Sequence, residues 1–146
     1  MLVRDILKLK NGETKTIGPE QKVKEAMSLL LENKISCLPV VSPEGELMGI
    51  VSDKDIFRKA YQSPEQFLEC AIKEIMTARL IVGLESDEIG YIGGIMTKNR
   101  IRHVPIVEQD RLIGLVSVGD VVKSQIENME IENRYLKQYI DGSYPG

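Results

Sequence analysis

Two short motifs combine a hydroxyl and a carboxylate at a spacing that suits ligand binding. Ser52 and Asp55 form the first motif, and Ser117 and Asp120 form the second. Each motif follows a β-rich apolar run and opens a predicted helix, where free backbone N–H groups and the positive end of the helix dipole attract an anion. The carboxylate can in addition accept hydrogen bonds from two vicinal hydroxyls. The motifs therefore predict ligand-binding positions at two helix starts.

The same spacing also fits a helix capping box. In that arrangement the Ser hydroxyl accepts a hydrogen bond from the third residue of the helix, and the acidic side chain reaches back to the Ser N–H. One protein can use both roles, because the hydroxyl can cap the helix while the site is empty. The motifs alone leave a purely structural interpretation open.

Four basic-type side chains lie within six positions of a chain whose net charge is −3, namely Lys98, Arg100, Arg102 and His103. Lys98 and Arg100 end a predicted helix, where cations are favoured by about 0.3–1 kcal/mol. Arg102 and His103 fall on the next predicted strand and are expected to point to opposite faces. We infer that the phosphates of a ligand lie beside Arg102 or His103.

Other chemistries have less support in the sequence. His103 is the only histidine, which leaves little for a histidine-based metal site or a Ser-His triad. Cys37 has no matching histidine in its half of the chain and is interpreted as a small strand residue. No GxxxxGK phosphate loop is present, and the glycines between residues 90 and 94 do not form a GxGxxG motif after a strand. The sequence therefore predicts no catalytic residue and no metal.

The composition agrees with a soluble globular protein, because 42% of the 146 residues are hydrophobic and 28% are charged. A pI of about 5.3 argues against a general nucleic-acid binder, which needs a basic face. No apolar run approaches the roughly 18 residues of a membrane span, and the first residues lack the apolar region of a signal peptide. The two cysteines, Cys37 and Cys70, show no framework spacing, so we expect a cytoplasmic protein.

The first half of the chain reads as alternating short strands and helices. Apolar residues recur at i, i+3, i+4, i+7 and i+8 from Val23, which is helical spacing. Two β-rich runs separated by Ser42-Pro43-Glu44-Gly45-Glu46 predict a hairpin. The predicted elements are a strand at 15–17, a helix at 23–33, strands at 37–41 and 47–51, a helix at 53–61 and a short helix at 63–70.

The second half repeats this pattern. Asn33, Ile35 and Pro39 reappear 66 positions later, and Gly49, Ser52 and Asp55 reappear 65 positions later. The residue that is lost falls in the hairpin loop, where deletions are tolerated. One departure is the helix expected from Ile89, which contains Gly90, Gly93 and Gly94. Such a helix either packs unusually close to a neighbour or is locally mobile, because each interior Gly costs about 1 kcal/mol.

A unit of roughly 60 residues with three short strands cannot cover both faces of its sheet, so two units are expected to pack together. We predict a first repeat at 1–62, a connector at 63–71, a second repeat at 72–124, and a C-terminal helix and tail at 125–146. The apolar stripe of that helix runs further than so small a core requires, which predicts a homodimer. The stripe consists of Val122, Ile126, Met129, Leu136 and Ile140.

The duplicated pattern resembles a pair of CBS domains, the Bateman module, in its stand-alone bacterial form. The resemblance is carried by residues 35–41 with 49–55, and by residues 100–107 with 114–120. It implies an α+β fold of two β-α-β-β-α units, packed sheet to sheet about a pseudo-two-fold axis, here followed by a long C-terminal helix. It also implies an adenosyl ligand, which is AMP, ADP, ATP, NAD or S-adenosylmethionine.

The resemblance further implies roles for individual residues. Asp55 and Asp120 would hold the ribose hydroxyls, and Ser52 and Ser117 would reach the phosphate. The positions that match adenine contacts are Gly18, Val23, Ile35, Ser36 and Ile50 in the first repeat, and Leu84, Ile89, Ile101, Arg102 and Leu115 in the second. His103 and Pro105 complete the predicted nucleotide-binding set.

The two repeats are not equivalent, because the first has Ser36 and Cys37 where the second has Arg102 and His103. We therefore favour the second repeat's site and treat the first as optional. The cleft is shared, so the two basic side chains can serve a nucleotide held by either repeat.

The function predicted in this way is that of a non-catalytic regulatory module. It binds an adenine nucleotide of the AMP, ATP or NAD type between the two repeats and signals energy or redox state by a change of conformation. Its expected partners are a second copy of itself and an effector protein that the sequence does not identify, with no catalytic cofactor, nucleic acid or membrane. Two alternatives stay open: a ligand-free interaction subunit and, with less support, a nucleotide-hydrolysing enzyme.

Overall fold

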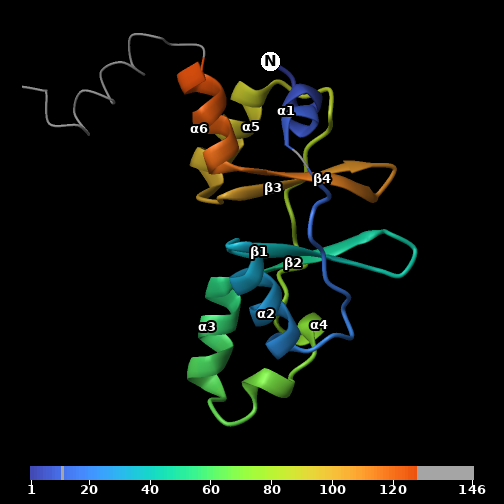
Figure 1. Cartoon of the computed structure of the whole chain (residues 1–146), viewed down its shortest axis with the longest axis vertical. Coiled ribbons are helices and arrows are strands. Elements are labelled where there is room, and N and C mark those ends of the chain that lie inside the picture. The colour runs from blue at the N-terminus through green and yellow to red at the C-terminus, as the bar shows by residue number, and fades with distance from the viewer. Residues whose placement is uncertain (11, 128–146) are drawn as a thin grey trace, which may run out of the picture.

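The computed structural model describes residues 1–10 and 12–127 of the chain. Two antiparallel hairpins lie next to one another in the middle of the molecule, and helices cover the outer side of each (Figure 1). In chain order the elements are α1 (Val3–Leu9), α2 (Val23–Asn33), β1 (Cys37–Val41), β2 (Leu47–Ser52), α3 (Asp53–Gln62), the 3-10 helix η1 (Phe67–Glu69), α4 (Ile72–Ile75), α5 (Ile89–Asn99), β3 (His103–Glu108), β4 (Arg111–Ser117) and α6 (Val118–Glu127). The predicted α+β fold of two repeated units is therefore present.

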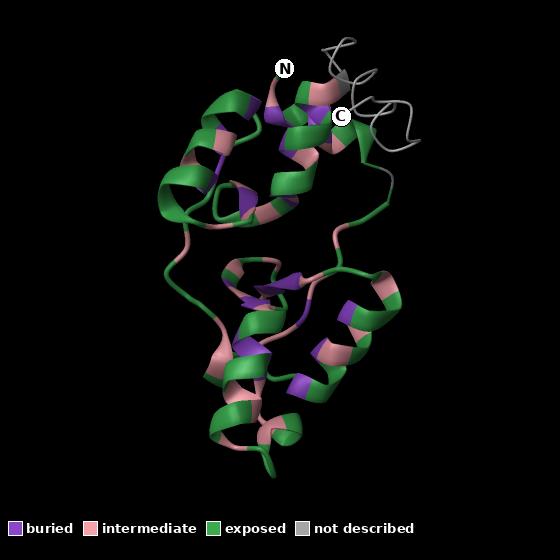
Figure 2. Ribbon diagram, turned by 90° about the vertical axis from the view of Figure 1, so that its left-hand side faces the viewer, coloured by how far each residue is buried: buried purple, intermediate pink, exposed green. Residues whose placement is uncertain are grey.

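Each hairpin carries two sets of buried side chains. In β1 the alternating residues Leu38 and Val40 point into a hydrophobic core with α2 and α3, while Cys37 and Pro39 face the other unit. In β3 the residues Val104 and Ile106 take the same place in a second core with α5 and α6. Figure 2 shows the buried residues along the inner sides of the helices and on the hairpins, with exposed residues outside.

Each of the short helices α1 and α4 packs in the core of the other repeat. The helix α1 belongs to the core of the second unit, and α4 belongs to the core of the first. Val3 and Ile6 of α1 lie in the core formed by α5, β3, β4 and α6, although they precede the first repeat in the chain. Ile72 of α4 lies in the core of the other unit, with residues such as Val23 and Val51. The segments that follow α1 and α4 must therefore each cross from one unit to the other, as Figure 1 shows.

Two predicted elements are shorter than expected. The strand at 15–17 is wrong, because Ile17 alone makes a parallel bridge with Val40, and Gly83 makes the same bridge with Ile106 in the second unit. The helix at 63–70 is also wrong, because Ser63 ends α3 and the chain then makes single turns into η1.

The other predicted helices and strands either agree with the structure or include residues that the structure does not describe. The helix at 23–33 and both hairpins are confirmed. The predicted long C-terminal helix is described only as far as Glu127, the last residue of α6, and the remainder of its apolar stripe lies outside the described residues. No helix in the described ranges has the length and apolarity that a membrane crossing needs.

The glycine-rich segment forms the helix α5, and its glycines differ in their surroundings. A Cβ atom on Gly93 would lie 3.0 Å from Cγ1 of Val121 in α6, whereas a Cβ atom on Gly90 or Gly94 would meet no heavy atom within 4 Å. Of the two alternatives that the sequence left open, close packing therefore applies to Gly93. Gly90 and Gly94 face open space and carry only the entropic cost of glycine in a helix.

This difference in surroundings predicts that alanine stabilises the protein at position 94 but not at position 93. Gly94→Ala should raise the free energy of unfolding by about 0.5–1 kcal/mol, because alanine restricts the unfolded chain and fits the open side of α5. Gly93→Ala should give no such gain, because its methyl group presses on the buried Val121 side chain. Urea unfolding of both variants measures the difference, and an equal gain in both would contradict the close packing of α5 on α6.

Candidate functional site

The first motif forms a capping box at the start of α3. The Asp55 N–H donates a hydrogen bond to Ser52 Oγ (3.2 Å), and the Ser52 N–H donates to Asp55 Oδ2 (2.9 Å). Ser52 Oγ also donates to Asp55 Oδ2 (3.0 Å). The other carboxylate oxygen, Oδ1, has only Arg58 near it among the described residues, at 3.6 Å. The structural role is therefore present, and one oxygen of Asp55 is left over from it.

A cavity of about 300 Å³ lies beside this motif, and we call it the Asp55 cavity. Its walls come from four places: the first hairpin with the residue before it, the start of α3, the crossing segment 77–81, and the beginning of β3. The crossing segment is held to the hairpin by Thr77, whose N–H and C=O pair with those of Ile50. The predicted site residues that line this cavity are Ser36, Ile50, Ser52, Asp55, Ile101, Arg102, His103 and Pro105.

Three cationic side chains line the Asp55 cavity. Lys54, Arg79 and Arg102 line it, and none of them forms an ion pair within the described part of the chain. Arg102 directly precedes β3, so the expectation that it lies on the strand is wrong. Arg102 and His103 both line this cavity. An anion that enters the cavity meets several unpaired positive groups.

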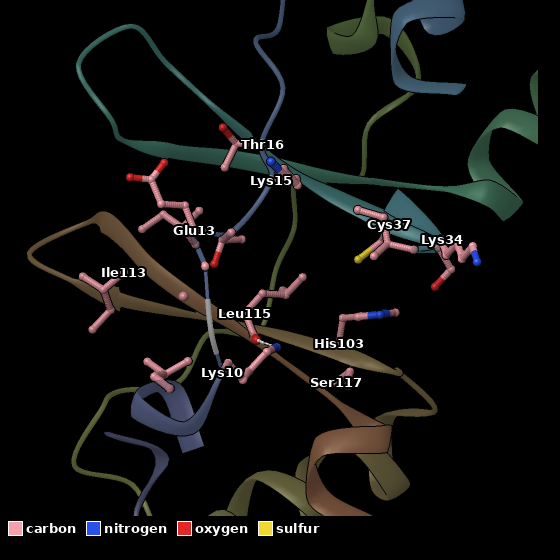
Figure 3. A pocket seen from close by; sticks show the side chains of 17 residues that line it. Lys10, Glu13, Lys15, Thr16, Lys34, Cys37, His103, Ile113, Leu115 and Ser117 are labelled. Carbon is pink, nitrogen blue, oxygen red and sulfur yellow. Dashed lines mark hydrogen bonds between the residues drawn. The ribbon is translucent and has the colours of Figure 1, made fainter. Parts of the chain in front are cut away.

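A second cavity, of about 880 Å³, lies between the two hairpins and adjoins the first at Ser36, Cys37 and His103 (Figure 3). We call it the Asp120 cavity because it adjoins the second motif. The end of α1, the crossing segment 12–16 and β4 form most of its walls. The predicted site residues that line it are Ile35, Ser36, Leu115, Ser117 and His103, the last of which also lines the Asp55 cavity.

The second motif is also a capping box, but its carboxylate is engaged by a lysine. Ser117 N–H donates to Asp120 Oδ2 (2.8 Å), and Asp120 N–H donates to Ser117 Oγ (3.1 Å). Lys10 Nζ lies 2.9 Å from the same Oδ2 atom and donates to the Leu115 carbonyl oxygen (2.7 Å). Burial would raise the pKa of Asp120, but the bonds from Ser117 and Lys10 outweigh it, so the pKa lies below its usual value. Asp120 itself does not line the cavity.

Four predicted adenine contacts lie outside both cavities. Val23 and Ile89 are buried in the two hydrophobic cores, where their side chains cannot reach a ligand. Gly18 lies on a different shallow pocket near α2, and Leu84 is an exposed residue beyond the crossing segment. Gly18 and Leu84 directly follow the bridge residues Ile17 and Gly83, and Val23 and Ile89 are the first residues of α2 and α5.

The sequence interpretation did not include the residues contributed by the crossing segments. Lys10 and Arg79 were not singled out, and neither were Leu80 and Ile81, which line the Asp55 cavity. A signal for Arg79 was available, since it lies four residues after the end of α4 in a stretch without helical or strand periodicity. What the sequence did not indicate is that this stretch crosses between units.

The remaining reactive groups do not suggest catalysis. Cys37 touches both cavities, but burial raises the pKa of its thiol to about 12, with Asp53 adding to the effect. A thiol with so high a pKa is a poor nucleophile. The described residues contain no group of three or more His, Cys, Asp and Glu side chains that could hold a metal ion.

His103 lies where both cavities meet, and its pKa is lowered from the ordinary value of 6.5. Burial is the main cause, and the positive charges of Arg102 and Lys10 act in the same direction. At a pH between the pKa of His103 in the folded protein and its pKa in the unfolded chain, the unfolded chain binds more protons than the folded protein. The stability that neutral His103 provides is therefore complete above about pH 6.5 and is lost as the pH falls through the folded pKa.

We predict that His103→Gln weakens this loss of stability between pH 7.5 and pH 5.5, as measured by urea unfolding against the wild-type protein. Because His103 is the only histidine, the single imidazole resonance in an NMR titration also reports its pKa directly. A midpoint at or above 6.5 would contradict the proposed surroundings of the ring.

Comparison with known proteins agrees with this architecture. The model of the CBS domain family matches residues 3–61 and 72–127. The CBS domain-containing protein YhcV of Bacillus subtilis is 32% identical over 114 residues, which are 77% of this chain and 79% of that protein. The crystal structure of the CBS-domain containing protein ATU1752 from Agrobacterium tumefaciens superimposes with a TM-score of 0.80 at 30% identity, covering 86% of this chain and 99% of that one.

A further similar structure is the CBS domain pair of protein MJ0100, solved in complex with 5′-methylthioadenosine and S-adenosyl-L-methionine. It is 29% identical to this chain, with a TM-score of 0.75, and the match covers 88% of this chain and 98% of that one. The two repeats, their swapped short helices and the matched residues lead to one conclusion: the chain belongs to the CBS domain family and is a CBS-domain pair.

Proposed function

We propose that this protein is a non-catalytic regulatory module that binds an adenosine-containing ligand in the Asp55 cavity. The observation that carries the proposal is a combination found there: a carboxylate oxygen that capping does not use, and three cationic side chains that form no ion pair with any residue the structure describes. The carboxylate suits the two hydroxyls of a ribose, and the cations suit phosphate.

The remaining walls of the Asp55 cavity fit the other parts of such a ligand. Ile50, Ile81 and Ile101 offer apolar surface for a flat base. The first turn of α3, a helix of ten residues, contributes the positive end of its dipole beside the motif. The ligands named for the MJ0100 domain pair, 5′-methylthioadenosine and S-adenosyl-L-methionine, both contain an adenosine, which supports this class of ligand.

Charge narrows the choice of ligand within that class. Lys54, Arg79 and Arg102 favour a nucleotide with phosphate groups over the sulfonium cation of S-adenosylmethionine. We therefore propose a ligand of the AMP, ATP or NAD type.

The proposal pairs the first repeat's motif with the second repeat's Arg102 and His103, whereas the sequence favoured the second repeat's motif. We prefer the first repeat's motif because the carboxylate of the second motif, Asp120, is already engaged in an ion pair with Lys10.

Regulation follows from the origin of the cavity walls. The α3 start belongs to one unit, β3 belongs to the other, and the crossing segment joins them. A ligand that contacts all three favours one relative position of the units, and only such a differential contact can shift a conformational equilibrium. We propose that this shift is transmitted to an effector protein and so reports energy or redox state.

We further propose that the module works as a homodimer. The helices α3 and α6 lie on the same side of the molecule (Figure 1) and expose apolar side chains at i, i+4 spacing. Phe57 and Tyr61 of α3 are 76% and 85% exposed, and Val118 and Val122 of α6 are 38% and 47% exposed. A second copy of the chain that packs on this face would bury all four side chains.

The ligand assignment is tested by Asp55→Asn. The asparagine keeps an oxygen that can accept the hydrogen bond from the Ser52 N–H, but it removes the negative charge that strengthens hydrogen bonds from ribose hydroxyls. AMP at about 100 times its Kd should add about 2.7 kcal/mol to the stability of the wild-type protein and nothing to that of the variant, as measured by thermal melting. Asp120→Asn is the matched control and should respond as the wild type does.

The two alternatives give different results in the same experiment. A melting temperature that no adenosine compound changes would support a ligand-free interaction subunit. Loss of AMP from the incubated sample, detected by chromatography and abolished in Asp55→Asn, would support an enzyme. An unchanged response of Asp55→Asn to AMP would contradict the assignment of the Asp55 cavity.

The dimer is tested by a double substitution, Phe57→Ser with Tyr61→Ser. Removing two exposed aromatic side chains from α3 should convert the protein to a monomer, as measured by light scattering after gel filtration. Leu31→Ser in α2 is the control, because Leu31 is 77% exposed on a different helix and should leave the mass unchanged. A wild-type protein that is monomeric at micromolar concentration would contradict the proposal.

A further inference from the structure

We infer that Lys10 blocks the Asp120 cavity to ribose, so that each chain binds one adenosine ligand although it contains two motifs. This inference rests on the proposed function, since it concerns which of two related sites accepts the same ligand. It identifies Lys10 as a residue that determines binding stoichiometry.

The geometry of Lys10 resembles that of a bound ligand group. Its ammonium lies 2.9 Å from Asp120 Oδ2 and 2.7 Å from the Leu115 carbonyl oxygen, so one cation satisfies both the motif carboxylate and the neighbouring strand. Figure 3 shows the lysine side chain reaching Leu115 at the wall of the cavity. A ribose hydroxyl that approached Asp120 Oδ2 would have to displace the Lys10 ammonium, and an uncharged hydroxyl cannot replace the attraction between two opposite charges.

No lysine engages the first motif among the described residues, although the two sites are related by the internal repeat. The cation nearest to Asp55 there is the largely exposed Arg58, 3.6 Å from Oδ1, whereas Lys10 lies 2.9 Å from Asp120 Oδ2.

Leu7 packs on Gly114 and Met76 packs on Gly49, so the ends of α1 and α4 correspond. Arg79 follows Met76 by three positions, as Lys10 follows Leu7.

The two corresponding cations nevertheless behave differently. Arg79 lines the Asp55 cavity and forms no ion pair among the described residues, whereas Lys10 is bound to Asp120.

The lengths of the crossing segments account for this difference. Ile17 follows Leu7 by ten positions, whereas Gly83 follows Met76 by only seven. The short segment is held to the hairpin by the backbone pairing of Thr77 with Ile50, so the Ile50 carbonyl is already occupied by a backbone N–H and Arg79 forms no ion pair with Asp55. In the long segment the Leu115 carbonyl instead accepts a hydrogen bond from the Lys10 side chain. This bond holds the Lys10 ammonium beside Asp120.

The rival to this inference is that Lys10 leaves Asp120 when a nucleotide binds and moves onto its phosphate. The two possibilities differ for a ligand without phosphate. With 5′-methylthioadenosine Lys10 has no phosphate to bind, so its removal can only open the site. If Lys10 binds the phosphate of AMP, the substitution Lys10→Ala should weaken AMP binding.

The experiment is calorimetric titration of the full chain with 5′-methylthioadenosine and, separately, with AMP. We expect one ligand per wild-type chain, lost in Asp55→Asn, and two ligands per chain of Lys10→Ala. The second ligand should disappear in the double variant Lys10→Ala with Asp120→Asn. Lys15→Ala is the matched control, because Lys15 lines the same cavity without an ion pair among the described residues, and it should keep one ligand.

The outcomes separate this inference from the proposed function. One ligand per chain in Lys10→Ala, or two per wild-type chain with weaker AMP binding in Lys10→Ala, would overturn the role of Lys10 and leave the Asp55 site standing. No ligand in the wild type but one in Lys10→Ala would overturn the Asp55 site and support the role of Lys10. No ligand in any variant would overturn both.

Discussion

The structure depends on the need to cover both faces of a two-stranded hairpin. The helices α2 and α3 cover one face of β1 and β2, and the corresponding helices cover one face of β3 and β4. The strand residues that point the other way, such as Pro39 and Pro105, are buried only because a second hairpin lies opposite. Neither unit is therefore complete alone, and the surfaces left between them become the walls of the two cavities.

The exchange of α1 and α4 turns this packing into a binding architecture. Each crossing segment passes along the gap between the hairpins and contributes side chains that neither hairpin could supply, such as Arg79 on one side and Lys10 on the other. The two gaps start from the same repeated motif, but the crossing segments differ in length and in the residues they carry. The internal symmetry of the chain therefore produces two sites with different charge around the same Ser and Asp.

Much of the fold could be predicted because its signals are local. The periodic apolar residues of α2 and the capping motif at Ser52 depend on neighbours a few positions away, and the structure has them as predicted. The exchange of α1 could not be predicted, because Val3 and Ile6 have the same helical spacing whichever core they enter. The same limit applies to the site: Ser117 and Asp120 match the motif, but the engagement of Asp120 by Lys10 arises from a contact across 110 positions.

The position of α1 has a consequence for the order in which the protein assembles during synthesis. The first core needs Ile72, so it can close only when nearly half of the chain has left the ribosome. The helix α1 is made before the other described elements, yet its partners Val116 and Val121 are made among the last described residues. Its apolar face thus stays without its native cover for most of translation, and the closing of the second unit is a late, long-range step.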